Sequence, residues 1–90
     1  MSKNTLKEPK KFKTRDLYEA AALLTSGEEI IDVEVENNIC RFVFGNYDIC
    51  HKKIISYTNN QLAVLAKDYT QAIKMLKGKI YGLIRDGDKR

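Results

Sequence analysis

Hydrophobic and polar positions follow two different periods along this 90-residue chain, one typical of helices and the other of strands. Between Ala66 and Arg85, apolar side chains recur every three or four residues, a spacing that places them on one face of a helix. These residues are Tyr69, Ala72, Ile73, Leu76, Ile80, Leu83 and Ile84. At about 1.5 Å rise per residue the helix would be roughly 30 Å long, so we expect its apolar face to close the core of a small domain.

A β-hairpin is the clearest local signal. From Glu29 to Glu36, apolar and acidic residues alternate with the period of a half-buried strand. Asn37 and Asn38 fit a two-residue type I′ turn, because asparagine tolerates a positive φ angle. This turn would pair Glu36 with Ile39, Val35 with Cys40, Glu34 with Arg41, Val33 with Phe42 and Ile31 with Phe44. The acidic outer face is interpreted as a solvated surface, with a protein-docking surface as the alternative.

Two shorter helices flank the hairpin. The first is expected to start at an N-cap on Thr14, to end at Gly27, and to bury Leu17, Ala20, Ala21 and Leu24. The second is predicted by the spacing of Tyr47, Cys50, Ile54 and Tyr57, with Asn46 or Asp48 as its cap. A weak alternation over Gln61–Val64 favours a short third strand, which would help to stabilise the hairpin.

These elements predict an α+β fold: helix, hairpin, helix, short strand, and a long C-terminal helix packed on the sheet. Residues 1–11 are expected to form a flexible basic arm, residues 12–85 a single domain, and residues 86–90 a polar tail. The predicted core joins Ile31, Val33, Val35, Phe42 and Phe44 of the hairpin to Leu17, Leu24, Ile54, Ile73, Leu76 and Ile80 of the helices.

Composition narrows the class of protein. With 43% hydrophobic and 31% charged residues, the chain resembles a globular domain. No apolar run approaches the ~20 residues of a membrane span, and the polar N-terminus does not resemble a signal peptide, so we expect no membrane and a cytoplasmic location. The two cysteines are interpreted as small, reduced, buried residues.

No catalytic or metal-binding pattern stands out. The sequence has no glycine-rich phosphate loop, no GxSxG and no HExxH. Cys50 and His51 are neighbours on a predicted helix, where adjacent side chains point about 100° apart and so do not converge. We therefore expect no enzymatic activity and no cofactor or metal.

Charge is unevenly distributed along the chain. Residues 1–15 carry six basic side chains and one acid, residues 16–49 one basic side chain and eight acids, and residues 50–90 nine basic side chains and three acids. Basic regions neutralise phosphates, and an exposed tyrosine can stack on an unpaired base, so we predict binding of single-stranded DNA or RNA. The candidate residues are Lys67, Lys74, Lys77, Tyr81 and Arg85 on the last helix, with Lys52, Lys53, Lys10, Lys11 and Lys13 extending the same pole.

Other functions remain open. A solvated helix displays lysines opposite its apolar face in any case. The acidic strand and the small size favour instead a protein-interaction module, such as a factor that binds and modulates a host protein. Within the last helix, Tyr69, Ile73, Leu76, Ile80 and Leu83 also step as coiled-coil positions do, which leaves a homodimer open beside packing on the hairpin.

The chain also resembles a known family. The residues that carry this likeness are the opening Phe12, Thr14, Asp16, Leu17 and Tyr18, the run Phe42-Val43-Phe44, and Leu76-Lys77 of the last helix. Together they are similar to a family of short prokaryotic and phage proteins described as a domain of unknown function. The resemblance implies no activity and no catalytic residues, but it implies that such domains travel with phages and mobile elements.

Overall fold

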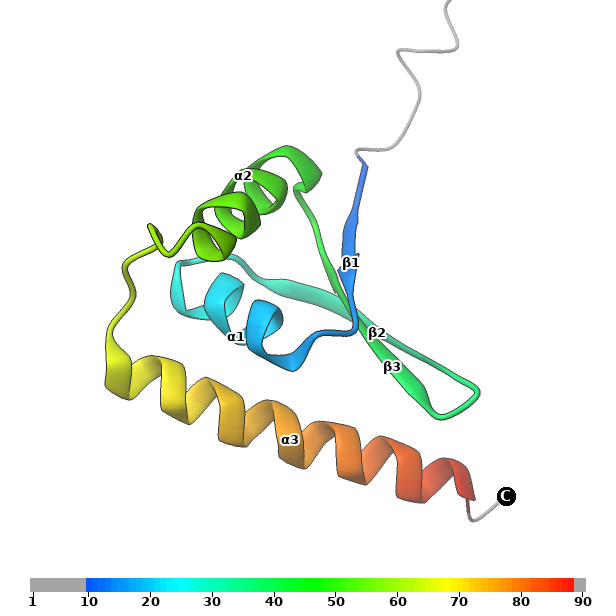
Figure 1. The fold of residues 1–90 in the computed structure, drawn as a ribbon. Coiled ribbons are helices and arrows are strands. Elements are labelled where there is room, and N and C mark those ends of the chain that lie inside the picture. The colour runs from blue at the N-terminus through cyan, green and yellow to red at the C-terminus, as the bar shows by residue number, and fades with distance from the viewer. Residues whose placement is uncertain (1–9, 89–90) are drawn as a thin grey trace, which may run out of the picture.

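The structure, a computed structural model, describes residues 10–88, with side chains as far as residue 84. In chain order its elements are β1 (Phe12–Thr14), α1 (Leu17–Thr25), β2 (Ile30–Glu36), β3 (Ile39–Phe44), α2 (Tyr47–Thr58) and α3 (Ala66–Asp88). The predicted α+β class is confirmed. In Figure 1, α1 lies between α2 and α3, and buried side chains of all three helices join the same core cluster as the sheet phenylalanines.

The third strand lies at the start of the domain. No strand forms at residues 61–65, so the predicted strand over Gln61–Val64 is wrong. Instead β1 pairs with β3, which places β3 in the middle of the order β1-β3-β2. Phe12 lies opposite Phe44 in this pairing, and three residues are too few to show a strand period in the sequence. Of the predicted arm, residues 1–9 lie outside the described residues.

The hairpin follows the predicted register except at one residue. Asn37 and Asn38 have φ angles of 54° and 65°, as a type I′ turn requires. The pairs from Glu36 with Ile39 to Val33 with Phe42 are confirmed. The predicted pairing of Ile31 with Phe44 is wrong, because a β-bulge makes Ile30 the partner of Phe44. Ile31 is the extra residue and is 52% exposed.

The ends of α1 are fixed by local hydrogen bonds. Its N-cap is Asp16, whose carboxylate accepts hydrogen bonds from the main-chain nitrogens of Tyr18 and Glu19 at 2.8 and 3.1 Å. The predicted cap, Thr14, lies two residues too early: its hydroxyl accepts from the nitrogen of Asp16 and donates to Glu19. At the other end, Gly27 has a φ angle of 106°, which confirms the predicted stop.

The core is built around α1. Its four consecutive residues Ala20–Leu23 are fully buried, and four positions sweep about one helical turn, so this middle turn of α1 is enclosed on all sides. Small alanines allow this close approach. The remaining members of the buried cluster are Phe42, Phe44, Cys50 and Leu76. The predicted core residues Leu17, Leu24, Val33, Ile54, Ile73 and Ile80 pack against it while partly buried, whereas Val35 and Ile31 are exposed.

The apolar face of α3 packs against the core of its own chain. Leu76 is 1% exposed and reaches the sheet phenylalanines, and Tyr69, Ile73 and Ile80 pack beside it. These are the residues that a coiled-coil dimer would need. A dimer through this face would therefore have to displace α3 from the core.

The opposite face of the sheet carries no described helix. Its central residue, Val43, is nevertheless only 2% exposed. On this face the ammonium of Lys13 in β1 lies 3.1 Å from the carboxylate of Glu34 in β2. Because β3 lies between these two strands, the ion pair crosses the middle of the sheet on the face that carries Val43.

Candidate nucleic-acid interface

Four of the predicted binding residues form one stripe on α3, which we call the α3 stripe: Lys67, Lys74, Lys77 and Tyr81. At about 100° per residue they fall within an arc of about 80°, on the side of the helix turned away from buried Leu76. All four are exposed, and Tyr81 is 68% exposed. Arg85 belongs to α3, but its side chain lies outside the described part of the chain.

The charges of the α3 stripe are not neutralised by neighbours. Among the side chains that the structure describes, Lys67, Lys74 and Lys77 have no ion pair. Along the helix axis Lys67 and Lys74 are roughly 10 Å apart, and Lys77 follows roughly 5 Å further. Three cations in line, followed by an exposed aromatic ring, could contact successive phosphates and one unpaired base.

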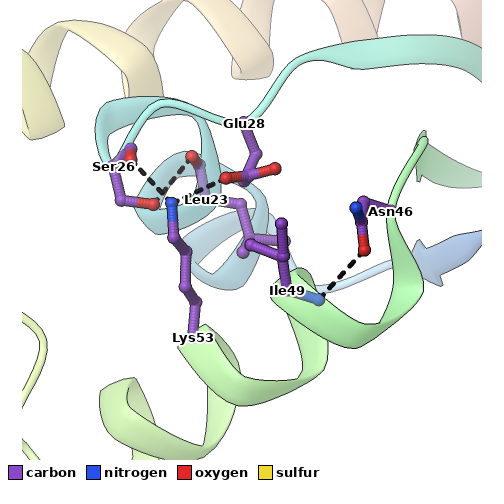
Figure 2. Close-up of polar contacts among 6 residues, drawn as sticks. All are labelled: Leu23, Ser26, Glu28, Asn46, Ile49 and Lys53. Carbon is purple, nitrogen blue, oxygen red and sulfur yellow. Dashed lines mark hydrogen bonds and ion pairs between the residues drawn. The ribbon is translucent and has the colours of Figure 1, made fainter.

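Lys53 does not belong to this surface. Figure 2 shows its ammonium donating to the main-chain oxygen of Ser26 and to the carboxylate of Glu28, each at 2.7 Å. Ser26 is the C-cap of α1, so the cation lies at the negative end of the helix dipole. The charge pattern groups Lys53 with the basic pole, but in the structure its side chain is only partly exposed, because its position on α2 lies close to that of buried Cys50. Sequence reasoning also missed Glu28 as its partner.

The remaining basic candidates lie in other places. Lys52 is exposed on α2, and Figure 1 shows α2 and α3 on opposite sides of α1, so Lys52 does not extend the α3 stripe. Lys10 lies over the ring of Tyr47, with its ammonium 4.4 Å from the ring centre, and Tyr47 stacks on His51. Lys11 is exposed beside Lys10. Lys13 is paired with Glu34 across the sheet.

A group of tyrosines joins the three helices. The hydroxyls of Tyr57 and Tyr69 are 3.5 Å apart, and that of Tyr69 donates to the main-chain oxygen of Tyr18 at 3.4 Å. Burial and the bond to Tyr57 raise the pKa of Tyr69 well above its usual range. This group fixes α3 against α1 and α2, which positions the α3 stripe.

The described residues offer little for nucleophilic or metal chemistry. Cys40 and Cys50 are free thiols, as predicted, and burial raises the pKa of each, which disfavours the reactive thiolate. Within residues 10–88, no three His, Cys, Asp or Glu side chains gather as metal ligands would. No helix in this part of the chain is both long and apolar enough to cross a membrane.

Three comparisons with known proteins were made. The sequence model of a family described as Domain of unknown function (DUF5659) matches residues 9–82. Searches of curated proteins and of solved structures gave no match. The matched range runs from just before β1 to the last third of α3, so it includes all three described strands and the whole α3 stripe.

Proposed function

We propose that this chain, which belongs to the family Domain of unknown function (DUF5659), binds single-stranded nucleic acid through the α3 stripe. The family supplies no activity, so the proposal stands on surface chemistry alone. The observation that carries it is the row of three exposed lysines on one side of α3, none of them in an ion pair with a described side chain, followed by the exposed ring of Tyr81.

The chemistry of the α3 stripe favours a single strand over a duplex. Lysine ammonium groups contact phosphates without reading the sequence, and they would bind DNA and RNA alike. Tyr81 adds a flat ring that only an unpaired base can stack on, and such stacking is worth about 1–3 kcal/mol per base. We therefore expect single strands of DNA or RNA to bind more tightly than the matching duplex.

The test uses two double variants that each remove two lysine charges. Lys74→Ala with Lys77→Ala removes two cations from the α3 stripe, and Lys79→Ala with Lys52→Ala removes two exposed cations from other surfaces. Fluorescence anisotropy with a labelled oligonucleotide at low salt measures affinity. We expect the first pair to weaken binding about tenfold or more and the second pair to change it much less.

Salt dependence gives an independent readout. If three lysines contact phosphates of a single strand, the logarithm of the affinity should fall with the logarithm of the salt concentration with a slope of about −2. Tyr81→Ala should weaken binding without changing this slope, because it removes stacking and no charge. Equal losses for both pairs of lysine variants, or no binding at low salt, would refute the proposal.

A further inference from the structure

The outer edge of β2 presents free main-chain groups. In a hairpin closed by a two-residue turn, Glu36 and Ile39 form a hydrogen-bonded pair, and such pairs alternate along the strands. Glu34 therefore bonds to β3, whereas the main-chain groups of Val33 and Val35 point away from the sheet. Because β2 is an edge strand, no other strand in the described part of the chain meets them.

One of these groups is already occupied. The main-chain nitrogen of Val33 donates to the carboxylate of Asp32, its own neighbour, at 2.8 Å. Within the described part of the chain, this arrangement leaves the carbonyl of Val33 and both main-chain groups of Val35 without a hydrogen-bond partner, and Val35 is 43% exposed. The edge is thus open over the half of β2 that lies nearest the turn.

An apolar groove runs along the helix side of this edge. Its volume is about 400 Å³, and it is lined by Ile30 and Val33 from β2 and by Met75 and Leu76 from α3. Met75 is 53% exposed there. Apolar side chains of a strand laid against β2 would point into this groove on every second residue.

The other side of the same edge is acidic. Asp32, Glu34 and Glu36 lie on the sheet face opposite the helices, because their partners include Val43 and Arg41 on that face. No basic residue occurs in β2. The remaining side chains of an added strand would meet this row of carboxylates, and Glu34 already pairs with a lysine there.

We infer that the free edge of β2 binds an extended segment of a partner protein whose residues alternate between apolar and basic. The segment adds a fourth strand to the sheet, its apolar side chains enter the groove between β2 and α3, and its basic side chains meet the carboxylates. This site is separate from the α3 stripe and does not depend on nucleic-acid binding.

A second copy of this chain is a poor occupant of the same edge. Two β2 strands paired side by side would bring their rows of Asp32, Glu34 and Glu36 together. Like charges on neighbouring strands destabilise the pairing. Charge thus favours a basic partner and disfavours assembly of the chain with itself.

The probe is a labelled peptide of about seven residues that alternates valine and lysine, which matches the length of β2. We expect it to bind in fluorescence anisotropy and a peptide alternating valine and glutamate to fail. Two further peptides carry methyl groups on every second main-chain nitrogen, one on the odd-numbered and the other on the even-numbered residues. Only one of these two sets of nitrogens faces β2, so one methylated peptide should lose binding and the other should keep it. This control needs no change to the protein.

A protein variant addresses the edge directly. Val35→Pro removes a main-chain nitrogen donor that does not bond to β3, so the hydrogen bonds of the hairpin are kept. The peptide loses one hydrogen bond, and its affinity should fall about tenfold or more, which corresponds to about 1.4 kcal/mol. Val35→Ala should retain binding. Lys74→Ala with Lys77→Ala, which alters the α3 stripe, should leave peptide affinity unchanged. Three outcomes would overturn the inference: binding of both methylated peptides, equal binding of the acidic peptide, or no binding of either unmethylated peptide.

Discussion

The ammonium of Lys53 and a carboxylate oxygen of Glu28 lie 2.7 Å apart, between α2 and the segment that follows α1. The same ammonium donates to the main-chain oxygen of Ser26. Both side chains are largely removed from water, with 25% and 19% of their side-chain surface exposed. The pair ties α2 to the chain just beyond the end of α1, so its role is in stability.

Lys53→Met keeps the aliphatic stem and removes the charge. We expect the free energy of unfolding to fall by about 1–3 kcal/mol, because Glu28 and the Ser26 carbonyl lose a charged donor. Urea denaturation measures the change. Lys52→Met, one residue earlier and exposed, is the control and should stay within about 0.5 kcal/mol of the native chain. Equal stability of the two variants would contradict a structural role for Lys53.

Leu76 is the residue of α3 that reaches the buried cluster. Leu76→Ala should cost about 2–5 kcal/mol, because it leaves a cavity beside the sheet phenylalanines. Against a total stability of about 5–15 kcal/mol, this change threatens the fold of so small a domain. Leu65→Ala removes the same atoms from a side chain that is 70% exposed, and thermal unfolding should barely change. A similar loss in both variants would argue against docking of α3 at Leu76.

The bulge in β2 places Ile31 and Val33 in different surroundings, so substitutions at the two positions should differ in their effect on stability. Ile31→Thr alters an exposed side chain and should change the free energy of unfolding by less than about 0.5 kcal/mol. Val33→Thr places a hydroxyl against the core cluster and should cost about 1–3 kcal/mol. A regular strand would bury both residues on one face, and the two substitutions would then cost the same.

Stability should fall in alkaline solution. Folding raises the pKa of Tyr69 above its ordinary value of 10.0 and that of Cys50 above 9.0, chiefly through burial. The folded chain therefore holds these protons more tightly than the unfolded chain, and the stability that they contribute is present below about pH 9 and lost as pH rises further.

Urea denaturation at about pH 7.5 and about pH 10.5 measures this fall. Tyr69→Phe cannot lose a proton at that position, so its stability should depend less steeply on pH than that of the native chain. Cys50→Ala should flatten the lower part of the same range. An unchanged pH dependence in both variants would show that these two groups do not control it.

Much of the fold could be predicted because the deciding interactions are local. The period of the apolar residues identified α2 and α3, and Asn37-Asn38 fixed the register of the hairpin from Val33 to Glu36. Gly27 marked the end of α1 because its backbone needs a positive φ angle. In the candidate site, the exposure of Lys67, Lys74, Lys77 and Tyr81 followed from the same helical period.

The errors arise where distant parts of the chain decide the outcome. The bulge at Ile31 belongs to the pairing of β2 with β3, and the alternating pattern of β2 alone does not predict it. Lys53 depends on Glu28, 25 residues away in sequence, and β1 depends on its pairing with β3. The helical period therefore predicts whether a basic residue lies on the surface. It does not predict whether a carboxylate from another element already neutralises that residue.

The ion pair of Lys13 and Glu34 links the two edge strands of the sheet across β3, on the face that carries no helix in the described part of the chain. Val43, the partner of Lys13 on β3, lies on the same face and is 2% exposed. Shortening Lys13 would remove this side-chain link between β1 and β2 and leave the main-chain pairing of both strands with β3 in place, so the two edges of the sheet would then be joined only through its central strand.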